Sequence, residues 1–268
     1  MQKFKIGVIT DSFRLDFKSA VKKAAEVGAQ GIQPYATDGT ELAYSNMTSA
    51  KIAELRTIVA DNGLCFSALC GDFGKGFSSK EENPLRIEKS KQIIDLALAL
   101  GANIVTTHVG VIPQDKNCEK YQLMLEAGRQ LAEYAASNKA YFALETGLES
   151  AQAMRDYLDL LPKGIAVNYD PANLVMVAAD DPVQGVYTLK DYIVHTHAKD
   201  GIQIKKATDV ERCVYKELPL GQGDVPFDPY LAALADIGYN GFLTIEREVG
   251  ENPEADIKMA VGFLKGKM

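Results

Sequence analysis

The feature that most constrains the fold is a regular alternation of short apolar, β-branched runs with longer stretches of helical spacing. Between the apolar runs, hydrophobic residues recur every three or four positions, as they do over residues 17–25. The eight strand candidates are residues 5–10, 31–35, 65–70, 103–109, 141–146, 165–170, 193–198 and 242–246. A strand–helix unit repeated about eight times predicts a sheet of parallel strands covered by helices.

Glycines at equivalent places support this repeat. Gly28, Gly63, Gly101 and Gly238 each stand between an expected helix and the next strand, where the chain must turn left-handed. No low-complexity linker, long charge run or composition break divides the 268 residues. We therefore predict an α/β fold with one (β/α)8 TIM-barrel domain over residues 1–268. An open doubly wound sheet is the alternative, but no Gly-x-Gly-x-x-Gly follows any expected strand.

Charge and polarity narrow the range of partners. Lys and Arg number 29 against 36 Asp and Glu, a net charge of -7, which argues against a protein that binds nucleic acid through a basic face. No apolar run approaches the ~20 residues of a membrane span, and the expected first strand leaves no room for a signal peptide. The four cysteines are scattered, without a C-x-x-C pair. We expect a cytoplasmic protein with no nucleic-acid or membrane partner.

Polar residues stand at the carboxyl ends of the last four expected strands. In a TIM barrel the active site lies at this end of the strands. Glu145, Asp170, His197 and Glu246 occupy these positions. Three carboxylates and one imidazole that converge would repel one another unless a cation held them. An oxygen-rich set with one nitrogen suits a single divalent ion, with Mn2+ expected first and Mg2+, Co2+ or Zn2+ as alternatives.

Each of these residues also has an interpretation without a metal. A strand-end glutamate is often a solvated or salt-bridged loop residue, and Asp170 before proline is a common turn signal. Strand alternation points His195 and His197 to the same face, so one would be the ligand and the other a packed or hydrogen-bonded histidine. We prefer His197 as the ligand because it lies nearer the mouth of the barrel.

Three further polar residues, His108, Asn173 and Lys199, are candidate substrate contacts. Lys199 could offer a cation to a developing oxyanion or to a phosphate, and Asn173 could hydrogen-bond a hydroxyl group. The alternatives are a strand-end histidine with its own partner, a helix cap by Asn173 and an ion pair between Lys199 and Asp200.

At these residues the sequence resembles the xylose isomerase-like superfamily of TIM-barrel sugar (phosphate) isomerases and epimerases. The resemblance covers essentially the whole chain, and it is carried by residues 143–146, 168–174, 195–200, 220–225 and 245–246, in that order. It implies a TIM-barrel enzyme in which Glu145, Asp170, His197 and Glu246 hold a single divalent metal. In the epimerases of that superfamily the two glutamates also act as the acid and base.

Some positions depart from subgroups of the superfamily. Ketose 3-epimerases that act on free sugars carry Glu, His and Arg where this chain has Ala151, Asn173 and Gln203. The side chains with which that subgroup binds its substrate are therefore not reproduced here. Endonuclease IV, a more distant member, needs three metals. His108 matches one further ligand, but residues 215–217 lack the required Asp-x-His, so a DNA-repair activity is not expected.

The expected function is a metal-dependent isomerase or epimerase of a keto sugar, a sugar phosphate or a related polyol ketone. Glu145 and Glu246 come from strands three apart, so one could remove a proton from a bound sugar, forming an enediolate, and the other return it. Loss of a β-hydroxyl from the same enediolate would instead make the protein a lyase of the inosose-dehydratase type. A barrel that binds carbohydrate without turnover is the third alternative. Oligomers are common in the superfamily, so a homo-oligomer is an alternative to a monomer.

Overall fold

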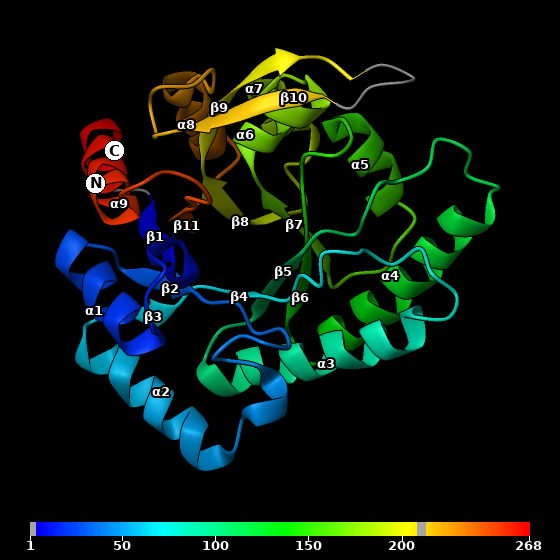
Figure 1. Cartoon of the computed structure of the whole chain (residues 1–268). Helices are drawn as coiled ribbons and strands as arrows, with labels where there is room; N and C mark the ends of the chain where they lie inside the picture. The colour runs from blue at the N-terminus through cyan, green and yellow to red at the C-terminus, as the bar shows by residue number, and fades with distance from the viewer. Residues whose placement is uncertain (1–3, 208–212) are drawn as a thin grey trace.

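The computed structural model describes residues 4–207 and 213–268, and in it parallel strands form a nearly closed barrel surrounded by helices (Figure 1). The barrel strands are β1 (Lys5–Ile9), β2 (Gly31–Gln33), β3 (Cys65–Phe66), β4 (Leu69–Cys70), β5 (Ile104–Thr107), β6 (Tyr141–Glu145), β7 (Ile165–Tyr169), β8 (Ile193–Ala198) and β11 (Phe242–Ile245). Each of the eight predicted runs contains a strand, and the predicted TIM-barrel fold is confirmed.

The third predicted run is divided into two short strands, and the barrel closes through both. β3 pairs in parallel with β2, whereas β4 pairs with β5. Ser67 lies in the gap between β3 and β4, and its hydroxyl donates to the carbonyl of Ile32 at 3.0 Å. The backbone N–H of Cys70 donates to the carbonyl of Pro34 at 2.9 Å. The chain between the two strands therefore stays bound to its neighbour although the regular ladder is interrupted.

Except between β3 and β4, a helical segment follows each barrel strand before the next one begins. The helices are η1 (Thr10–Phe13), α1 (Phe17–Val27), η2 (Tyr44–Asn46), α2 (Ser49–Asp61), α3 (Asn83–Leu100), α4 (Glu119–Ser137), α5 (Ala151–Leu158), α6 (Pro171–Asn173), η3 (Leu174–Ala178), α7 (Pro182–Thr188), α8 (Phe227–Asp236) and α9 (Pro253–Lys267). Gly28 and Gly101 end α1 and α3 with φ of 88° and 92°, the left-handed conformation that the glycine spacing predicted. Within the described residues, no helix combines the length and apolar character that crossing a membrane requires.

A two-stranded antiparallel hairpin follows β8 and was not expected from the sequence. It consists of β9 (Asp200–Lys205) and β10 (Val214–Leu218), and it packs on η3 and α6 at the edge of the barrel (Figure 1). Several of its side chains are exposed, such as those of Ile204 and Tyr215. Because most of the hairpin lies outside the core, it lacks the apolar pattern by which the barrel strands were predicted.

Candidate active site

The carboxyl ends of four neighbouring strands bring Glu145, Asp170, His197 and Glu246 together. β6, β7, β8 and β11 are adjacent in the sheet, so residues at their ends meet at one side of the mouth. All four residues are buried, and each offers one ligand atom such that the four atoms lie within 4.8 Å of one another. His197 Nδ1 lies 3.2 Å from Glu246 Oε2 and 3.4 Å from Glu145 Oε1.

The two oxygens of Asp170 have different roles. Oδ1 accepts the backbone N–H groups of Ala172 and Asn173 at 2.8 and 3.0 Å and so caps α6. Oδ2 is buried, has no hydrogen-bond partner among residues 4–207 and 213–268, and lies 3.8 Å from His197 Nδ1. A buried carboxylate oxygen without a partner is costly unless a cation or donor pairs with it. The donor set, three carboxylates and one imidazole, therefore fits a hard divalent ion.

A polar layer inside the barrel orients the cluster from below. Asn168 Nδ2 donates to Glu145 Oε2 at 3.2 Å, and Gln33 Oε1 lies 3.2 Å from His197 Nε2. With Nε2 of His197 hydrogen-bonded to Gln33, its Nδ1 faces the carboxylates, where it carries a proton in the metal-free chain and would turn a lone pair to a bound cation. Such second-layer hydrogen bonds are what hold a metal-binding histidine in one tautomer.

His195 lies outside the cluster and has partners of its own. Its Nδ1 is 2.8 Å from Asn168 Oδ1, and its Nε2 is 2.9 Å from Thr244 Oγ1. Burial, with a smaller contribution from His197, lowers the pKa of His195 well below its usual value, so the ring is neutral. The two histidines of β8 thus differ as expected, one within the cluster and one hydrogen-bonded beside it.

His108 lies between two carboxylates. Its Nε2 is 3.6 Å from Glu145 Oε1, and its Nδ1 is 2.9 Å from Asp72 Oδ2. The Glu145 charge, helped by Asp72, outweighs burial and raises the pKa of His108 to about 10. Asp72 is held in turn by the backbone N–H of Gly74, which donates to its Oδ1 at 2.8 Å. His108 therefore has the partner that the alternative interpretation required and also faces the cluster.

Asn173 and Lys199 also contact the cluster directly. Asn173 Nδ2 donates to Glu145 Oε1 at 3.1 Å, and Lys199 Nζ donates to Glu246 Oε2 at 3.0 Å. Lys199 Nζ also donates to Glu248 Oε2 at 2.8 Å. Neither alternative interpretation is found among the described residues, because Asn173 precedes η3 without a capping hydrogen bond from its side chain and the partners of Lys199 are these two glutamates. Burial would lower the pKa of Lys199, but Glu246 and other nearby acids raise it well above its usual value.

These side chains line a cavity of about 210 Å³ at the mouth of the barrel. The lining residues are Tyr35, Cys70, Asp72, His108, Glu145, Gly147, Leu148, Asn173, Val177, His197, Lys199, Tyr215, Glu246 and Glu248. Sequence reasoning missed four of its polar members: Tyr35, Asp72, Tyr215 and Glu248. Tyr35 ends the second predicted strand, Asp72 follows the third, and Glu248 lies two residues beyond Glu246. A search for polar residues at and just past the strand ends could therefore have found these three. Tyr215 comes from the unpredicted hairpin.

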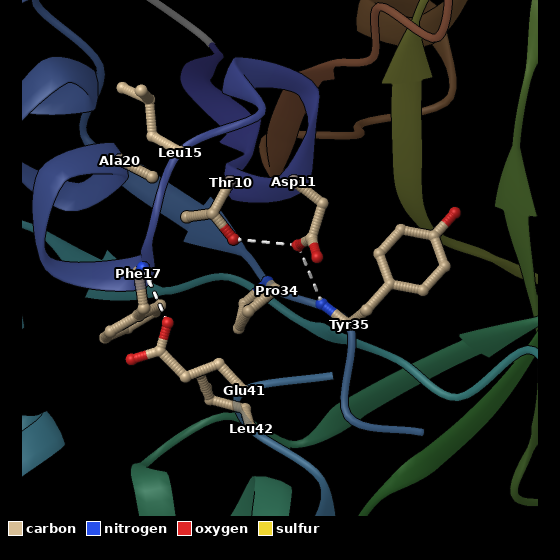
Figure 2. A pocket seen from close by; sticks show the side chains of 9 residues that line it. All are labelled: Thr10, Asp11, Leu15, Phe17, Ala20, Pro34, Tyr35, Glu41 and Leu42. Atoms are coloured by element: carbon tan, nitrogen blue, oxygen red, sulfur yellow. Dashed lines mark hydrogen bonds between the residues drawn. The ribbon is translucent and has the colours of Figure 1, made fainter. Parts of the chain in front are cut away.

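The place of Tyr35 is set from the end of the first strand (Figure 2). Asp11 Oδ2 accepts the backbone N–H of Tyr35 at 3.1 Å and the hydroxyl of Thr10 at 3.0 Å. Burial raises the pKa of Asp11. Figure 2 shows the Tyr35 ring turned away from Glu41. The cavity between these residues has a volume of about 40 Å³, close to the ~30 Å³ of one water molecule, which is too small for a substrate.

Comparison with known proteins adds to this geometry. A family model described as a xylose isomerase-like TIM barrel matches residues 21–267. An uncharacterized protein of Methanocaldococcus jannaschii is 25% identical over 190 residues, or 66% of this chain. The matched region spans 61% of that relative, less than two thirds of its length.

Solved structures resemble the chain over nearly all of its length. A xylose isomerase domain protein from Planctomyces limnophilus has a TM-score of 0.82 and 25% identity, covering 98% of this chain and 96% of that one. The probable 3-DHS dehydratase of Bacillus anthracis has a TM-score of 0.77 and 23% identity, with 98% and 99% covered. The 3-keto-D-glucoside 4-epimerase of E. coli has a TM-score of 0.75 and 17% identity, with the same coverage. The last two likenesses establish a shared fold.

Proposed function

Because the chain belongs to the xylose isomerase-like TIM-barrel family, we propose that it is a divalent-metal-dependent isomerase or epimerase of a keto sugar, sugar phosphate or related polyol ketone. The observation that carries the proposal is the buried, unpartnered Oδ2 of Asp170 within a cluster of three further ligand atoms. An oxygen so placed has no hydrogen-bond partner among the described residues, and a cation would supply one.

Glu145, Asp170, His197 and Glu246 would hold the ion. Mn2+ is the ion we expect, with Mg2+, Co2+ and Zn2+ as alternatives for an oxygen-rich set with one imidazole. A divalent ion there supplies Lewis-acid polarisation of a ketone carbonyl, which makes the neighbouring C–H more acidic. His108, Asn173 and Lys199 line the same cavity and are the side chains that we assign to substrate binding.

The two glutamates of the cluster are the proposed acid and base. Burial alone would raise the pKa of Glu145, but His108 and His197 hold it below its usual value. Lys199 and His197 do the same for Glu246. Both are therefore ionised and able to accept a proton from the carbon next to the carbonyl. β7 and β8 separate their strands, so the two carboxylates approach a bound ketone from different directions.

The choice between products depends on how many glutamates take part. If one removes the proton and the other returns a proton to the opposite face, the carbon is inverted and the reaction is an epimerisation. If a single glutamate moves the proton between neighbouring atoms, an aldose and a ketose interconvert. A metal-dependent dehydration is the second candidate, because loss of a β-hydroxyl from the same enediolate would give it, and the probable dehydratase shares this fold.

Solvent exchange tests the proposal and separates these reactions. The metal-loaded protein is incubated in deuterated water with free ketoses such as D-fructose, D-tagatose and D-psicose, and the products are followed by NMR and mass spectrometry. We expect deuterium at the carbon next to the carbonyl, together with a new isomer. Loss of one water from the product would identify the dehydration instead.

Matched variants assign the exchange to the cluster. Glu145→Gln and Glu246→Gln keep the side-chain shape but remove the base, so each should reduce exchange by about 100-fold or more. Glu251→Gln changes an exposed glutamate of the loop between β11 and α9 and should leave exchange as in the wild type. A chain that binds no divalent ion and shows no exchange would refute the proposed function.

A further inference from the structure

The charges around the cavity restrict what it can bind. We propose, on the basis of the proposed function, that the substrate is an uncharged polyhydroxy ketone of monosaccharide size and that ketones bearing phosphate or carboxylate are rejected. Four features of the cavity carry this inference: its cations, its net charge, the backbone donors beside it and its size.

No cation among the described residues that line the cavity is free to bind an anion. Lys199 is the one lysine or arginine in this lining, and its side chain is only 5% exposed. Its ammonium group already donates to Glu246 and Glu248, at 3.0 and 2.8 Å. His108 is likewise held between Asp72 and Glu145. A phosphate or carboxylate would have to displace one of these carboxylates to gain a partner.

The cavity is also negative as a whole. Asp72, Glu145, Glu246 and Glu248 line it, and Asp170 belongs to the cluster at its base. A divalent ion and Lys199 together bring three positive charges against these five carboxylates, so a negative charge remains whether or not His108 carries a proton. An anionic group brought into such a site is repelled, whereas a neutral polyol is not.

Backbone donors of the loop after β10, as far as the structure describes them, are bound to an internal carboxylate. TIM barrels commonly bind phosphate with the loops that follow the seventh and eighth strands. Here the loop after β10 directs the N–H groups of Gly221 and Gly223 at Asp200 Oδ2, each at 2.9 Å. Asp200 Oδ1 accepts the N–H groups of Gly201 and Val225 at 2.9 and 3.2 Å. Asp200 thus fills the position in which this loop would hold an anion.

Size and polarity match a free monosaccharide derivative. The volume of about 210 Å³ is smaller than the ~300–1,000 Å³ of pockets for drug-sized ligands. Carboxylates are acceptors, so they suit the hydroxyl donors of a polyol. Leu148, Val177 and Tyr215 add an apolar wall for the C–H face of a sugar.

A charge variant tests the inference without knowledge of the substrate. Glu248→Gln removes one partner of Lys199, and Glu251→Gln makes the same change of charge at an exposed position outside the cavity lining. The probe is inorganic phosphate added to the Mg2+-loaded protein, followed through the side-chain ¹⁵N signals of the three histidines. His108 reports on the cavity, and its signals are assigned with a His108→Gln variant.

We expect the wild type and Glu251→Gln to show no saturable phosphate binding up to about 10 mM. Glu248→Gln should bind phosphate with a Kd at least about tenfold below that limit. Saturable shifts of His108 in the wild type would overturn the inference. Equal gains in the two variants would do the same, because total charge rather than the freed Lys199 would then be responsible.

A second experiment compares D-fructose with D-fructose 6-phosphate, and D-tagatose with its 6-phosphate, as ligands of the metal-loaded protein. The melting temperature of the protein and deuterium exchange into each sugar are measured. Stabilisation or exchange confined to the free ketoses supports the inference. Exchange of a phosphate ester by metal-loaded protein would overturn the inference and leave the proposed function standing. A protein that binds no metal would refute both the inference and the proposed function.

Discussion

At the residue scale, Asp170 illustrates how one side chain serves both the fold and the site. Its Oδ1 caps α6, which fixes the carboxylate plane, and this leaves Oδ2 directed toward the cluster without a partner. Asp181 caps α7 in the same way, through Oδ1 to the N–H groups of Val183 and Gln184, and also precedes a proline. The two aspartates therefore differ in surroundings rather than in local sequence.

Asp170→Asn should separate metal binding from folding. The amide oxygen can still cap α6, but the neutral side chain loses a charged ligand, so we expect Mn2+ affinity to fall by at least about 100-fold. The metal-free variant should unfold at or above the wild-type temperature, because a buried unpaired charge has been removed. Titration calorimetry and thermal unfolding measure the two effects. Asp181→Asn is the control and should bind Mn2+ as the wild type does; weakened binding there would refute the assignment.

The buried carboxyl group of Glu149, which is not part of the cluster, should make the stability of the protein depend on pH. Its Oε2 is buried without a partner, and burial raises its pKa from 4.5 to about 7. Between these two values the folded chain binds the proton more tightly than the unfolded chain does. The free energy of unfolding therefore falls as pH rises through this window, by up to about 3 kcal/mol.

Glu149→Gln should abolish that part of the pH dependence. Relative to the wild type, the variant should gain stability between pH 5 and pH 8, because it has no charge to bury at the higher pH. Urea unfolding of both proteins at the two pH values measures the change, and Glu251→Gln controls for the loss of an exposed charge. A constant difference between wild type and variant would contradict the prediction.

At the element scale, the loop between β4 and α3 is anchored to the barrel rather than free. The backbone N–H of Phe77 donates to the carbonyl of Val109 at 3.0 Å, and Arg86 Nη1 donates to the carbonyl of Gly76 at 2.6 Å. The same loop holds Asp72 through Gly74, and Asp72 orients His108. The loop therefore positions a side chain of the cavity.

Two glycines of this loop give a matched pair of variants. Both have positive φ, but a Cβ on Gly76 would overlap the Val109 carbonyl and lie 2.7 Å from Gly110 Cα, whereas Gly74 has open space around it. Gly76→Ala should lower the free energy of unfolding by about 2–4 kcal/mol and Gly74→Ala by about 1 kcal/mol. Chemical denaturation measures both values. Equal losses would show that the close approach to Val109 does not matter.

At the scale of the whole molecule, the cluster links the ends of four adjacent strands, so occupancy by an ion should stabilise the entire barrel. At a free Mn2+ concentration 100 times Kd, binding adds about 2.7 kcal/mol to the free energy of unfolding. For a chain of this size that raises the melting temperature by about 5–10 °C. Chelation followed by Mn2+ add-back, monitored by calorimetry with metal analysis, measures the effect.

Two variants make the stabilisation specific to the cluster. His197→Ala and Glu145→Gln each remove a ligand, so their melting temperatures should respond little to Mn2+ add-back. Glu251→Gln should respond as the wild type does. A wild type that contains about one ion per chain and a His197→Ala variant that contains none would support the site. An equal response of all four proteins would indicate binding elsewhere.

Much of the fold follows from local patterns. Each barrel strand is a short apolar run and the helices between have helical spacing, so both could be recognised within a window of a few residues. The glycine after α1 and α3 marks its turn for a similarly local reason. β9 and β10 escaped prediction because they pack mainly on η3 and α6 rather than within the barrel.

Local patterns in the sequence are enough to predict the barrel and the four residues at its mouth, because the ends of parallel strands converge whenever the strands are adjacent. The partners that surround these residues depend on how distant parts of the chain pack together. Asp72 and His108 are 36 residues apart, and Lys199 and Glu246 are 47 apart, so no local pattern pairs them. The charge balance of the cavity depends on these long-range pairs, and with it the class of substrate that we infer.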